Sequence, residues 1–204
     1  MIIIMAGMMG TGKSTYTQWL ADEYRVIPQL ETVVDNPYLE KFYNDPKKYA
    51  YQLQQFFLED RVKALKEAVK SEHTVLDRSL LENEIFNYVY RDLGYLTEEE
   101  FQQCQQEMNQ AFNEIIKESH QEVLLIYLDG EFETVLKRIA QRGTEYERLE
   151  EGSHHLDYYR RLHDTYKEWY QRYDFSPKVA IDIQKFDVIH RPHEVIDYIK
   201  EELV

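Results

Sequence analysis

The first stretch of the chain that can do chemistry is a glycine-rich motif that fits the pattern GxxxxGK[ST] completely. Its residues, with the threonine that follows, are Gly7, Met8, Met9, Gly10, Thr11, Gly12, Lys13, Ser14 and Thr15. Glycines let backbone N–H groups turn inward and approach phosphate oxygens closely. Lys13 adds a charge for the β- and γ-phosphates, and the Ser14 hydroxyl can ligate Mg²⁺. The motif predicts a nucleoside-triphosphate site; the alternative is a chance glycine-rich turn.

Charged residues also follow two other apolar runs. Glu31 comes after VIPQL, and Asp77 and Arg78 come directly after VL. In open parallel sheets the carboxyl ends of the strands border the ligand crevice. Glu31 there can orient an acceptor hydroxyl and take its proton. Asp77 falls where a metal-linked carboxylate is needed, and Arg78 can steady Glu31 or the γ-phosphate. The alternatives are a solvated loop glutamate and a local Asp–Arg surface pair.

A predicted helix that starts at Pro46 carries two polar residues in an apolar stripe. The stripe consists of Ala50, Gln54, Phe57, Arg61 and Leu65, which share one helix face. The Gln54 amide has both a donor and an acceptor, so it can make paired hydrogen bonds to a base edge. The alternative is a stripe edge that lies in water.

Cations gather in the segment LKRIAQRG, which contains Lys137, Arg138 and Arg142. They can close over a triphosphate as a lid, which we expect over about residues 137–152. Gly143 then releases the chain into an acidic irregular segment that suits a mobile flap. The alternative is that these cations are only favoured near a helix C-terminus.

The elements that position these residues alternate between short apolar runs and longer helical ones. We expect strands over Ile2–Ala6, Val26–Leu30, Thr74–Leu76, Val123–Leu128 and Lys178–Ile183. We expect helices over Ser14–Tyr24, Pro46–Lys70, Leu80–Leu93, Thr97–Ser119, Glu131–Arg142, Leu156–Tyr173 and Pro192–Leu203. This alternation predicts a parallel sheet wrapped by helices.

Length and composition limit the class of protein. The 204 residues, with no linker, indicate a single domain over residues 1–204. A net charge of −14 argues against nucleic acid and anionic membranes as partners. A single cysteine, Cys104, excludes a disulfide framework and fits a cytosolic location. MIIIM lacks the basic leader of a signal peptide, and no stretch approaches a membrane span.

Nucleotide binding leaves three classes open: a phosphotransferase, a GTPase switch and a motor module. The sequence has neither an NKxD base-reading motif nor a DxxG turn, which a GTPase requires. A motor usually needs a larger or repeated architecture. A small kinase remains, which requires an acceptor site, a metal carboxylate and cations over the transferred group.

Over nearly its whole length the chain resembles the deoxynucleoside kinase family, and within it the bacterial deoxyadenosine/deoxyguanosine kinases. The resemblance rests on the glycine-rich loop followed in order by NPYLEKFY, YAYQLQQFFLEDR, DRS, KRIAQRG, YYRRLHDTYKEWY and SPKVAID. It implies a P-loop kinase-type α/β fold of three layers, with a five-stranded parallel sheet, flanking helices and a short lid. It also implies a dimer, of two identical or two related subunits, with the segments from Leu80 and Thr97 as candidates for its interface.

The resemblance implies roles at the acceptor. Glu31 is similar to the family's general base on the 5′-hydroxyl, and Tyr43 with Glu147 to the pair that holds the 3′-hydroxyl. Gln54 resembles the amide that grips the base, and Phe86 the ring that stacks on it.

The remaining implied roles surround the base and the phosphates. Arg61 matches the arginine of the base pocket, Asp77 and Arg78 match the acidic-Arg-Ser motif near Mg²⁺, and Arg138 and Arg142 match lid arginines.

Two positions depart from the family pattern. The lid usually reads RGR, whereas Thr144 stands in the second arginine's place, with Arg148 nearby as a possible substitute. The base-pocket arginine usually has an aspartate partner, whereas this chain has Asn83. Amide side chains suit adenine.

We therefore interpret the chain as an ATP- and Mg²⁺-dependent kinase that phosphorylates the 5′-hydroxyl of a deoxynucleoside in nucleotide salvage, with deoxyadenosine favoured. Deoxyguanosine or deoxycytidine is the alternative acceptor, and an end-product triphosphate is the expected feedback inhibitor. A nucleoside monophosphate kinase is a second alternative, although the segment from Glu31 to Ala50 lacks the arginines that a phosphorylated acceptor requires. A non-catalytic sensor of deoxynucleoside triphosphates is a third.

Overall fold

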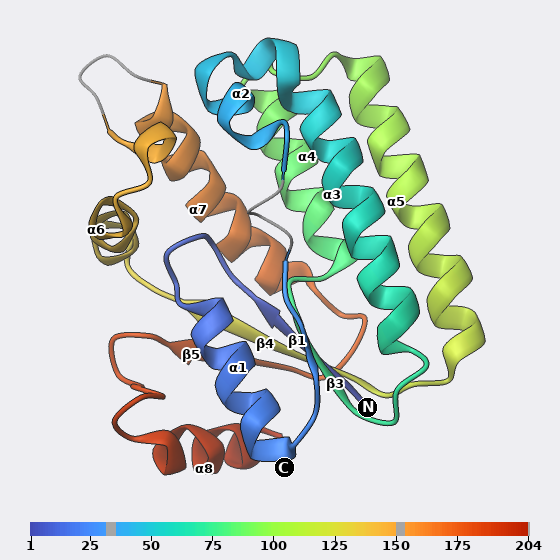
Figure 1. Ribbon diagram of the computed structural model, residues 1–204, viewed down its shortest axis with the longest axis vertical. Coiled ribbons are helices and arrows are strands. Elements are labelled where there is room, and N and C mark those ends of the chain that lie inside the picture. Colours follow the sequence, from blue (N-terminus) through green and yellow to red (C-terminus); the bar gives the residue numbers. More distant parts are fainter. Residues whose placement is uncertain (32–35, 150–153, 204) are drawn as a thin grey trace.

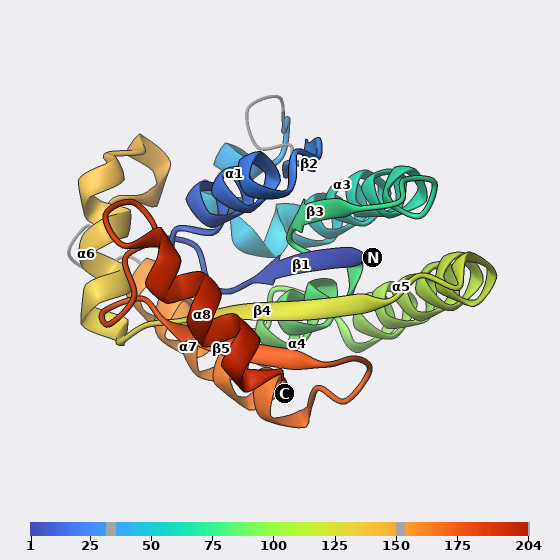
Figure 2. The same ribbon diagram turned by 90° about the horizontal axis from the view of Figure 1, so that it is seen from below.

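A five-stranded parallel sheet forms the centre of the computed structural model (Figure 1), which describes residues 1–31, 36–149 and 154–203. The strand order is β2-β3-β1-β4-β5 (Figure 2). The strands are β1 (Ile2–Ala6), β2 (Pro28–Gln29), β3 (Thr74–Asp77), β4 (Val123–Asp129) and β5 (Lys178–Asp182). Every residue of β1 and β3 is buried, as expected for strands that are covered on both faces.

Helices cover both faces of this sheet. They are α1 (Lys13–Tyr24), α2 (Leu39–Asn44), α3 (Pro46–Ala68), α4 (Asn83–Asp92), α5 (Glu98–Ser119), α6 (Phe132–Arg142), α7 (His155–Arg172) and α8 (Pro192–Glu202), with the 3-10 turns η1 (Leu80–Glu82) and η2 (Glu145–Glu147). In Figure 2, α1 and α8 lie on one face and α4, α5 and α7 on the other. The predicted three-layer α/β fold is confirmed.

The helix starts follow from local chemistry. Pro46 and Pro192 occupy the first turns of α3 and α8, where a missing N–H costs nothing. At α5 the Thr97 hydroxyl accepts from the Glu100 N–H, and the Glu100 carboxylate accepts in return from the Thr97 N–H. This reciprocal pair satisfies two otherwise unpaired donors.

The sheet register brings distant parts of the sequence together. Met5 at the end of β1 is level with Asp77 at the end of β3, and Ala6 is level with Tyr127 in β4. The loop after β1 and the residues after β3 therefore meet at the same edge of the sheet. That edge holds the site described below.

Local differences from the predicted elements concern the region after α1. The strand predicted over Val26–Leu30 pairs with β3 only at Pro28 and Gln29, because proline has no N–H and suits only an edge strand. Helix α2 and the turn η2 were not predicted, because each is too short to show a periodic pattern. The helix predicted over Leu80–Leu93 is divided into the 3-10 turn η1 and α4. Within the described ranges, no helix is long and apolar enough to cross a membrane.

Candidate active site

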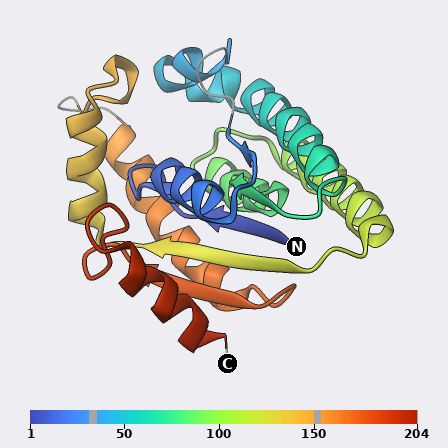
Figure 3. The same ribbon diagram turned by 60° about the horizontal axis from the view of Figure 1, so that its bottom comes forward.

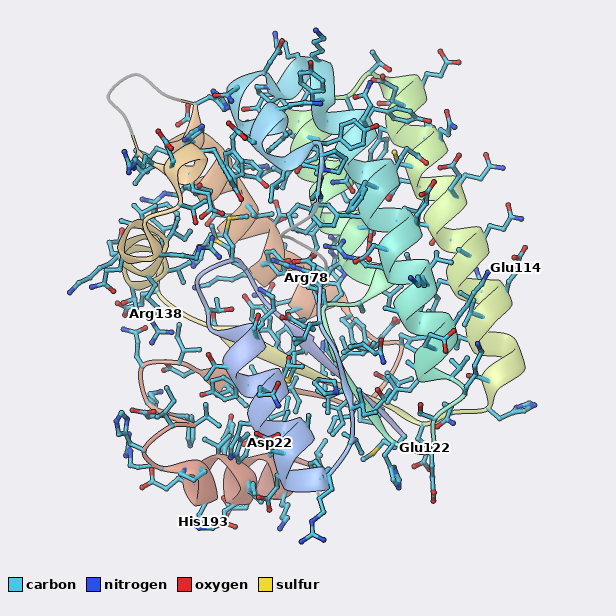
Figure 4. The ribbon with its side chains drawn as sticks, in the orientation of Figure 1. Asp22, Arg78, Glu114, Glu122, Arg138 and His193 are labelled. Carbon is cyan, nitrogen blue, oxygen red and sulfur yellow. The ribbon has the colours of Figure 1, made fainter. Side chains whose placement is uncertain are left out.

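A cavity of about 500 Å³ opens at the carboxyl edge of β1 and β3. Residues from the glycine-rich loop, from the ends of β2 and β3, from α3 and α4 and from the lid line it. Figure 4 shows Arg78 near the centre of the molecule, and Arg138 at the outer side on α6. Figure 3 shows α6 on one side of the molecule, with α3 and α5 side by side on the other. The cavity therefore lies between a helical wall and the cation-bearing α6.

The glycine-rich loop packs too closely for side chains at two of its positions. A Cβ on Gly7 would lie 2.9 Å from the Leu128 carbonyl oxygen, and one on Gly10 would lie 2.9 Å from the Val135 carbonyl oxygen. Both glycines also have positive φ angles, 145° and 83°, which only glycine adopts without strain. The loop is thus held as a tight turn directly before α1, the geometry that presents N–H groups to an anion.

Lys13 is folded back over this loop. Its Nζ donates to the Met8 carbonyl oxygen at 3.1 Å, and the side chain is buried. Burial, together with the nearby charge of Arg78, lowers the pKa of Lys13 to about 8. Met8 is itself part of the core, whereas Met9, Ser14 and Thr15 line the cavity.

Ser14 and Asp77 meet where the sequence predicts a metal site. The Ser14 hydroxyl donates to Asp77 Oδ2 at 2.6 Å. Asp77 Oδ1 is buried and has no hydrogen-bond partner among the described residues. No group of three His, Cys, Asp or Glu side chains that could hold a metal occurs in those residues. One carboxylate and one hydroxyl still suit Mg²⁺, which keeps several waters and takes phosphate oxygens as further ligands.

Glu31 lies between two arginines, and we call these three residues (Glu31, Arg61 and Arg78) the carboxylate clamp. Arg61 Nη2 donates to Glu31 Oε1 at 2.6 Å, and Arg78 Nε donates to Glu31 Oε2 at 2.8 Å. Burial alone would raise the pKa of Glu31, but Arg78 and Arg61 outweigh it and lower the pKa to about 2. The carboxylate is therefore ionised at any ordinary pH and can accept a hydrogen bond from a hydroxyl.

The candidate base pocket extends from the clamp along α3 and α4. Phe86 lies beside both clamp arginines, with its ring centroid 5.5 Å from the Arg61 guanidinium carbon and 5.4 Å from that of Arg78. Arg61 Nη1 donates to Asn83 Oδ1 at 2.7 Å, and the Asn83 amide donates to Gln54 Oε1 at 3.4 Å. Gln54 and Asn83 are buried and are absent from the described lining of the cavity, to which α3 and α4 contribute Leu53, Arg61 and aromatic rings.

The residues of the predicted lid have different hydrogen-bond partners. Arg142 makes a two-pronged ion pair with Glu147, with Nη2 at 2.6 Å from Oε1. Arg138 Nη1 donates to the Thr11 carbonyl oxygen at 3.3 Å. Tyr43 lines the same cavity as Glu147 but donates to Met9 Sδ at 3.4 Å. Tyr43 and Glu147, which are predicted to hold the 3′-hydroxyl together, thus both line the cavity. Among the described residues no hydrogen bond joins the two side chains.

The structure describes only some of the remaining residues of the predicted lid. Thr144 precedes η2, and Arg148 is exposed and does not line the cavity among the described residues. Residues 150–152, which the prediction of a lid over 137–152 includes, lie outside the described residues.

Two buried residues, Glu82 and Tyr166, contact the carboxylate clamp but were not predicted from the sequence. Arg78 Nη1 donates to Glu82 Oε1 and to the Tyr166 hydroxyl. Glu82 continues the apolar spacing of Ile85, Phe86 and Val89 at i, i+3, i+4 and i+7. An acid in that stripe is a signal for a buried, paired carboxylate, whereas Tyr166 carries no such signal among 17 tyrosines.

Comparison with known proteins agrees with this geometry. The sequence model of the family described as deoxynucleoside kinase matches residues 3–204. A deoxyguanosine kinase of Lactobacillus acidophilus is 37% identical, over 99% of this chain and 90% of its own length. A deoxyadenosine kinase of the same organism is 31% identical, over 98% and 94%. The solved deoxyadenosine kinase of M. mycoides with bound dATP has a TM-score of 0.81 and 29% identity, and covers 98% of this chain and 100% of its own.

Proposed function

We propose an acceptor and a set of residue roles for this chain, which belongs to the deoxynucleoside kinase family and is a phosphotransferase. The acceptor is the 5′-hydroxyl of a purine deoxynucleoside, and the donor is ATP. The observation that carries this proposal is the carboxylate clamp, which holds an ionised Glu31 in the same cavity as the glycine-rich loop.

Glu31 orients the acceptor hydroxyl. A carboxylate with a pKa of about 2 is a weak base, so its main contribution is to accept the hydroxyl's hydrogen bond in the correct line. Phosphoryl transfer passes through a loose transition state, in which the attacking oxygen needs little help from a base before it reacts. Position and electrostatics therefore supply most of the rate.

The donor phosphates are held by the loop amides, by Lys13 and by the lid arginines Arg138 and Arg142. Ser14 and Asp77 are the residues that would hold Mg²⁺, which would offset the negative charge of the donor phosphates. The orphaned buried oxygen of Asp77 supports this assignment. Arg142 can bind the phosphates only after its ion pair with Glu147 breaks.

The base preference rests on the chain Arg61–Asn83–Gln54. Deoxyadenosine is the first candidate, because an amide side chain pairs well with the donor–acceptor edge of adenine; since Gln54 and Asn83 do not line the cavity, this pairing requires one of them to turn toward the base. Deoxyguanosine is the second, because arginine donors suit the O6 and N7 acceptors of guanine. Arg61 Nε is buried and has no partner among the described residues, and relatives of this chain carry both names.

One assay tests the proposal. Initial rates are measured with ATP and Mg²⁺ and, in turn, deoxyadenosine, deoxyguanosine, deoxycytidine, thymidine and dTMP. We expect kcat/KM for the better purine to exceed that for thymidine by about 10-fold or more, the size of one paired base contact. Phosphorylation of dTMP alone contradicts the proposal, and so does a preference for thymidine.

We further propose that the chain forms a dimer and that a deoxynucleoside triphosphate inhibits it. The similar deoxyadenosine kinase of M. mycoides has been solved with bound dATP and with bound dCTP, which supports the inhibitor. The apolar stripes of both candidate helices, α4 and α5, are buried within the chain, so burial does not favour one of the two as the interface. Light scattering of the purified protein tests the dimer, and inhibition by dATP or dGTP that competes with the deoxynucleoside tests the inhibitor.

A further inference from the structure

Glu82 is a carboxylate with no exposed surface at the innermost part of the site. Its Oε1 accepts from Arg78 Nη1 at 3.1 Å, from the Tyr166 hydroxyl at 2.8 Å and from the Gly7 N–H at 3.4 Å. Its Oε2 accepts from the Ser79 N–H at 3.0 Å. A fully buried charge is retained only where it is paired and hydrogen-bonded, and here the paired cation is the clamp arginine.

Arg78 uses the two sides of its guanidinium for different partners. Nε faces outward and donates to Glu31. Nη1 faces inward and donates to Glu82, to the Tyr166 hydroxyl and to the Gly7 carbonyl oxygen, the last at 3.2 Å. Because the guanidinium is planar and rigid, fixing Nη1 also fixes the direction of the Nε–H bond toward Glu31.

The backbone of Arg78 adds a reason why such support is needed. Its φ angle is 75°, a conformation that costs a non-glycine residue energy and persists only when surrounding contacts determine it. The Arg78 N–H donates to the Met5 carbonyl oxygen at 3.0 Å. The side chain is held by contacts with Glu31, Gly7, Glu82 and Tyr166 and by the ring of Phe86.

The same contacts join the acceptor side to the donor side. Gly7 is the first residue of the glycine-rich loop, which we also call the phosphate loop. Both its N–H and its carbonyl oxygen take part in this network. Tyr166 brings in α7, the helix that follows the lid. A displacement of Glu82 would therefore change the distance between the acceptor clamp and the phosphate loop.

We propose that Glu82 and Tyr166 are positioning residues for phosphoryl transfer, which hold Arg78 so that Glu31 and the phosphate loop keep their alignment. This inference rests on the roles proposed above for Glu31 and Arg78. Neither Glu82 nor Tyr166 is among the described residues that line the cavity, so we expect substrate affinity to depend little on them. Misalignment of reacting groups by about 1 Å can cost about 100-fold in rate.

The expected effect is a split between kcat and KM. Glu82→Gln keeps the shape of the side chain but removes its charge, and we expect kcat to fall about 10-fold to 100-fold, with KM for ATP and for the deoxynucleoside within about 3-fold. Tyr166→Phe removes only a hydroxyl and should lower kcat about 3-fold to 10-fold. Matched controls that do not contact Arg78 are Glu84→Gln on α4 and Thr165→Val on α7, and both should retain wild-type kcat.

The decisive measurement repeats these variants in an Arg78→Lys background. Arg78→Lys alone should lower kcat strongly, and adding Glu82→Gln or Tyr166→Phe should then lower it by less than about 2-fold. An equal loss in both backgrounds means that Glu82 only stabilises the fold, and it overturns the inference. If Glu82→Gln does not fold, Tyr166→Phe carries the same test. A wild-type kcat in Arg78→Lys would instead contradict the role proposed for Arg78.

Discussion

Two arginine–carboxylate groups in this molecule have nearly equal bond lengths but very different surroundings. In the carboxylate clamp the Arg61–Glu31 distance is 2.6 Å, and the side chains are 5% and 13% exposed. In the lid the Arg142–Glu147 distance is also 2.6 Å, and Glu147 is 8% exposed, but Arg142 is 48% exposed, so only one partner of this pair reaches solvent. Exposed ion pairs contribute about 0 to 1 kcal/mol, whereas breaking a buried pair costs about 3 to 5 kcal/mol. Bond length alone therefore does not tell which group is fixed.

The difference separates the two halves of the reaction. The clamp, where we propose that the acceptor binds, is buried, and its Arg78 contacts the buried Glu82 and Tyr166, so its geometry does not require a bound substrate. The lid arginine is held by a contact that water and a phosphate can replace. We infer that variants on the buried side act mainly on kcat and that lid variants act mainly on substrate affinity.

The largest effect should come from the phosphate loop. Lys13→Ala removes the charge that offsets the transferring phosphoryl group, and we expect kcat to fall by about 100-fold to 1,000-fold with every acceptor alike. Steady-state rates with at least two deoxynucleosides measure this, with Lys66→Ala on the exposed face of α3 as the control. If kcat falls with only one of the deoxynucleosides, Lys13 does not bind the phosphates.

The clamp itself is tested by Glu31→Gln. The amide keeps the shape but cannot satisfy two arginines, so kcat should fall by at least about 100-fold. Glu40→Gln, an exposed glutamate on α2, is the control for the substitution. Near-normal turnover would remove Glu31 from the mechanism and with it the contrast between the buried site and the lid.

The affinity for ATP should depend on pH through Lys13. Its pKa in the free protein is about 8, so the ammonium is present below pH 8 and is lost as the pH rises through that value. Because phosphates bind the charged form, the Kd for MgATP should stay constant below pH 8 and rise about 10-fold by pH 9. Titration calorimetry from pH 7 to 9.5 measures this. The same rise in Lys13→Ala would assign the effect to another group.

The smallest effect should come from the lid. Glu147→Gln frees Arg142 and weakens the proposed contact with the 3′-hydroxyl, so KM for the deoxynucleoside should rise about 3-fold to 10-fold. Turnover at saturation should change by less than about 3-fold. Glu145→Gln, exposed in the same turn, is the control. A loss in kcat larger than that of Glu31→Gln would reverse the comparison between the lid and the clamp.

The fold was predictable wherever a pattern extended over enough residues. The buried runs of β1 and β4 and the longer helices were predicted within two residues at each end, whereas α4 begins three residues after the predicted start at Leu80. Helix α2 was not, because six residues are too few to show a helical period. The strand β2 was predicted too long, because its proline cannot take part fully in a ladder.

For the site, the sequence predicted residues that the sheet edge then brings together, such as Ser14 with Asp77 and Glu31 with Arg78. Their roles remain predictions. Glu82 was missed because it resembles an ordinary acid in the first turn of a helix, and Tyr166 because it resembles a core aromatic. Their function depends on which segments are neighbours in space, and no local pattern carries that information.

The strand order has a consequence for how the protein acquires activity as it folds. In the sheet β1 lies between β3 and β4, and Ile2 is level with Thr74 on one side and with Val123 on the other. These paired residues are far apart in the sequence. Bringing them together is slow, because the entropy of the intervening chain is lost before native contacts offset that loss. Helices can form early, but the phosphate loop and the clamp acquire their geometry only when these distant strands pair. A partly folded chain is therefore expected to be rich in helix and unable to transfer phosphate.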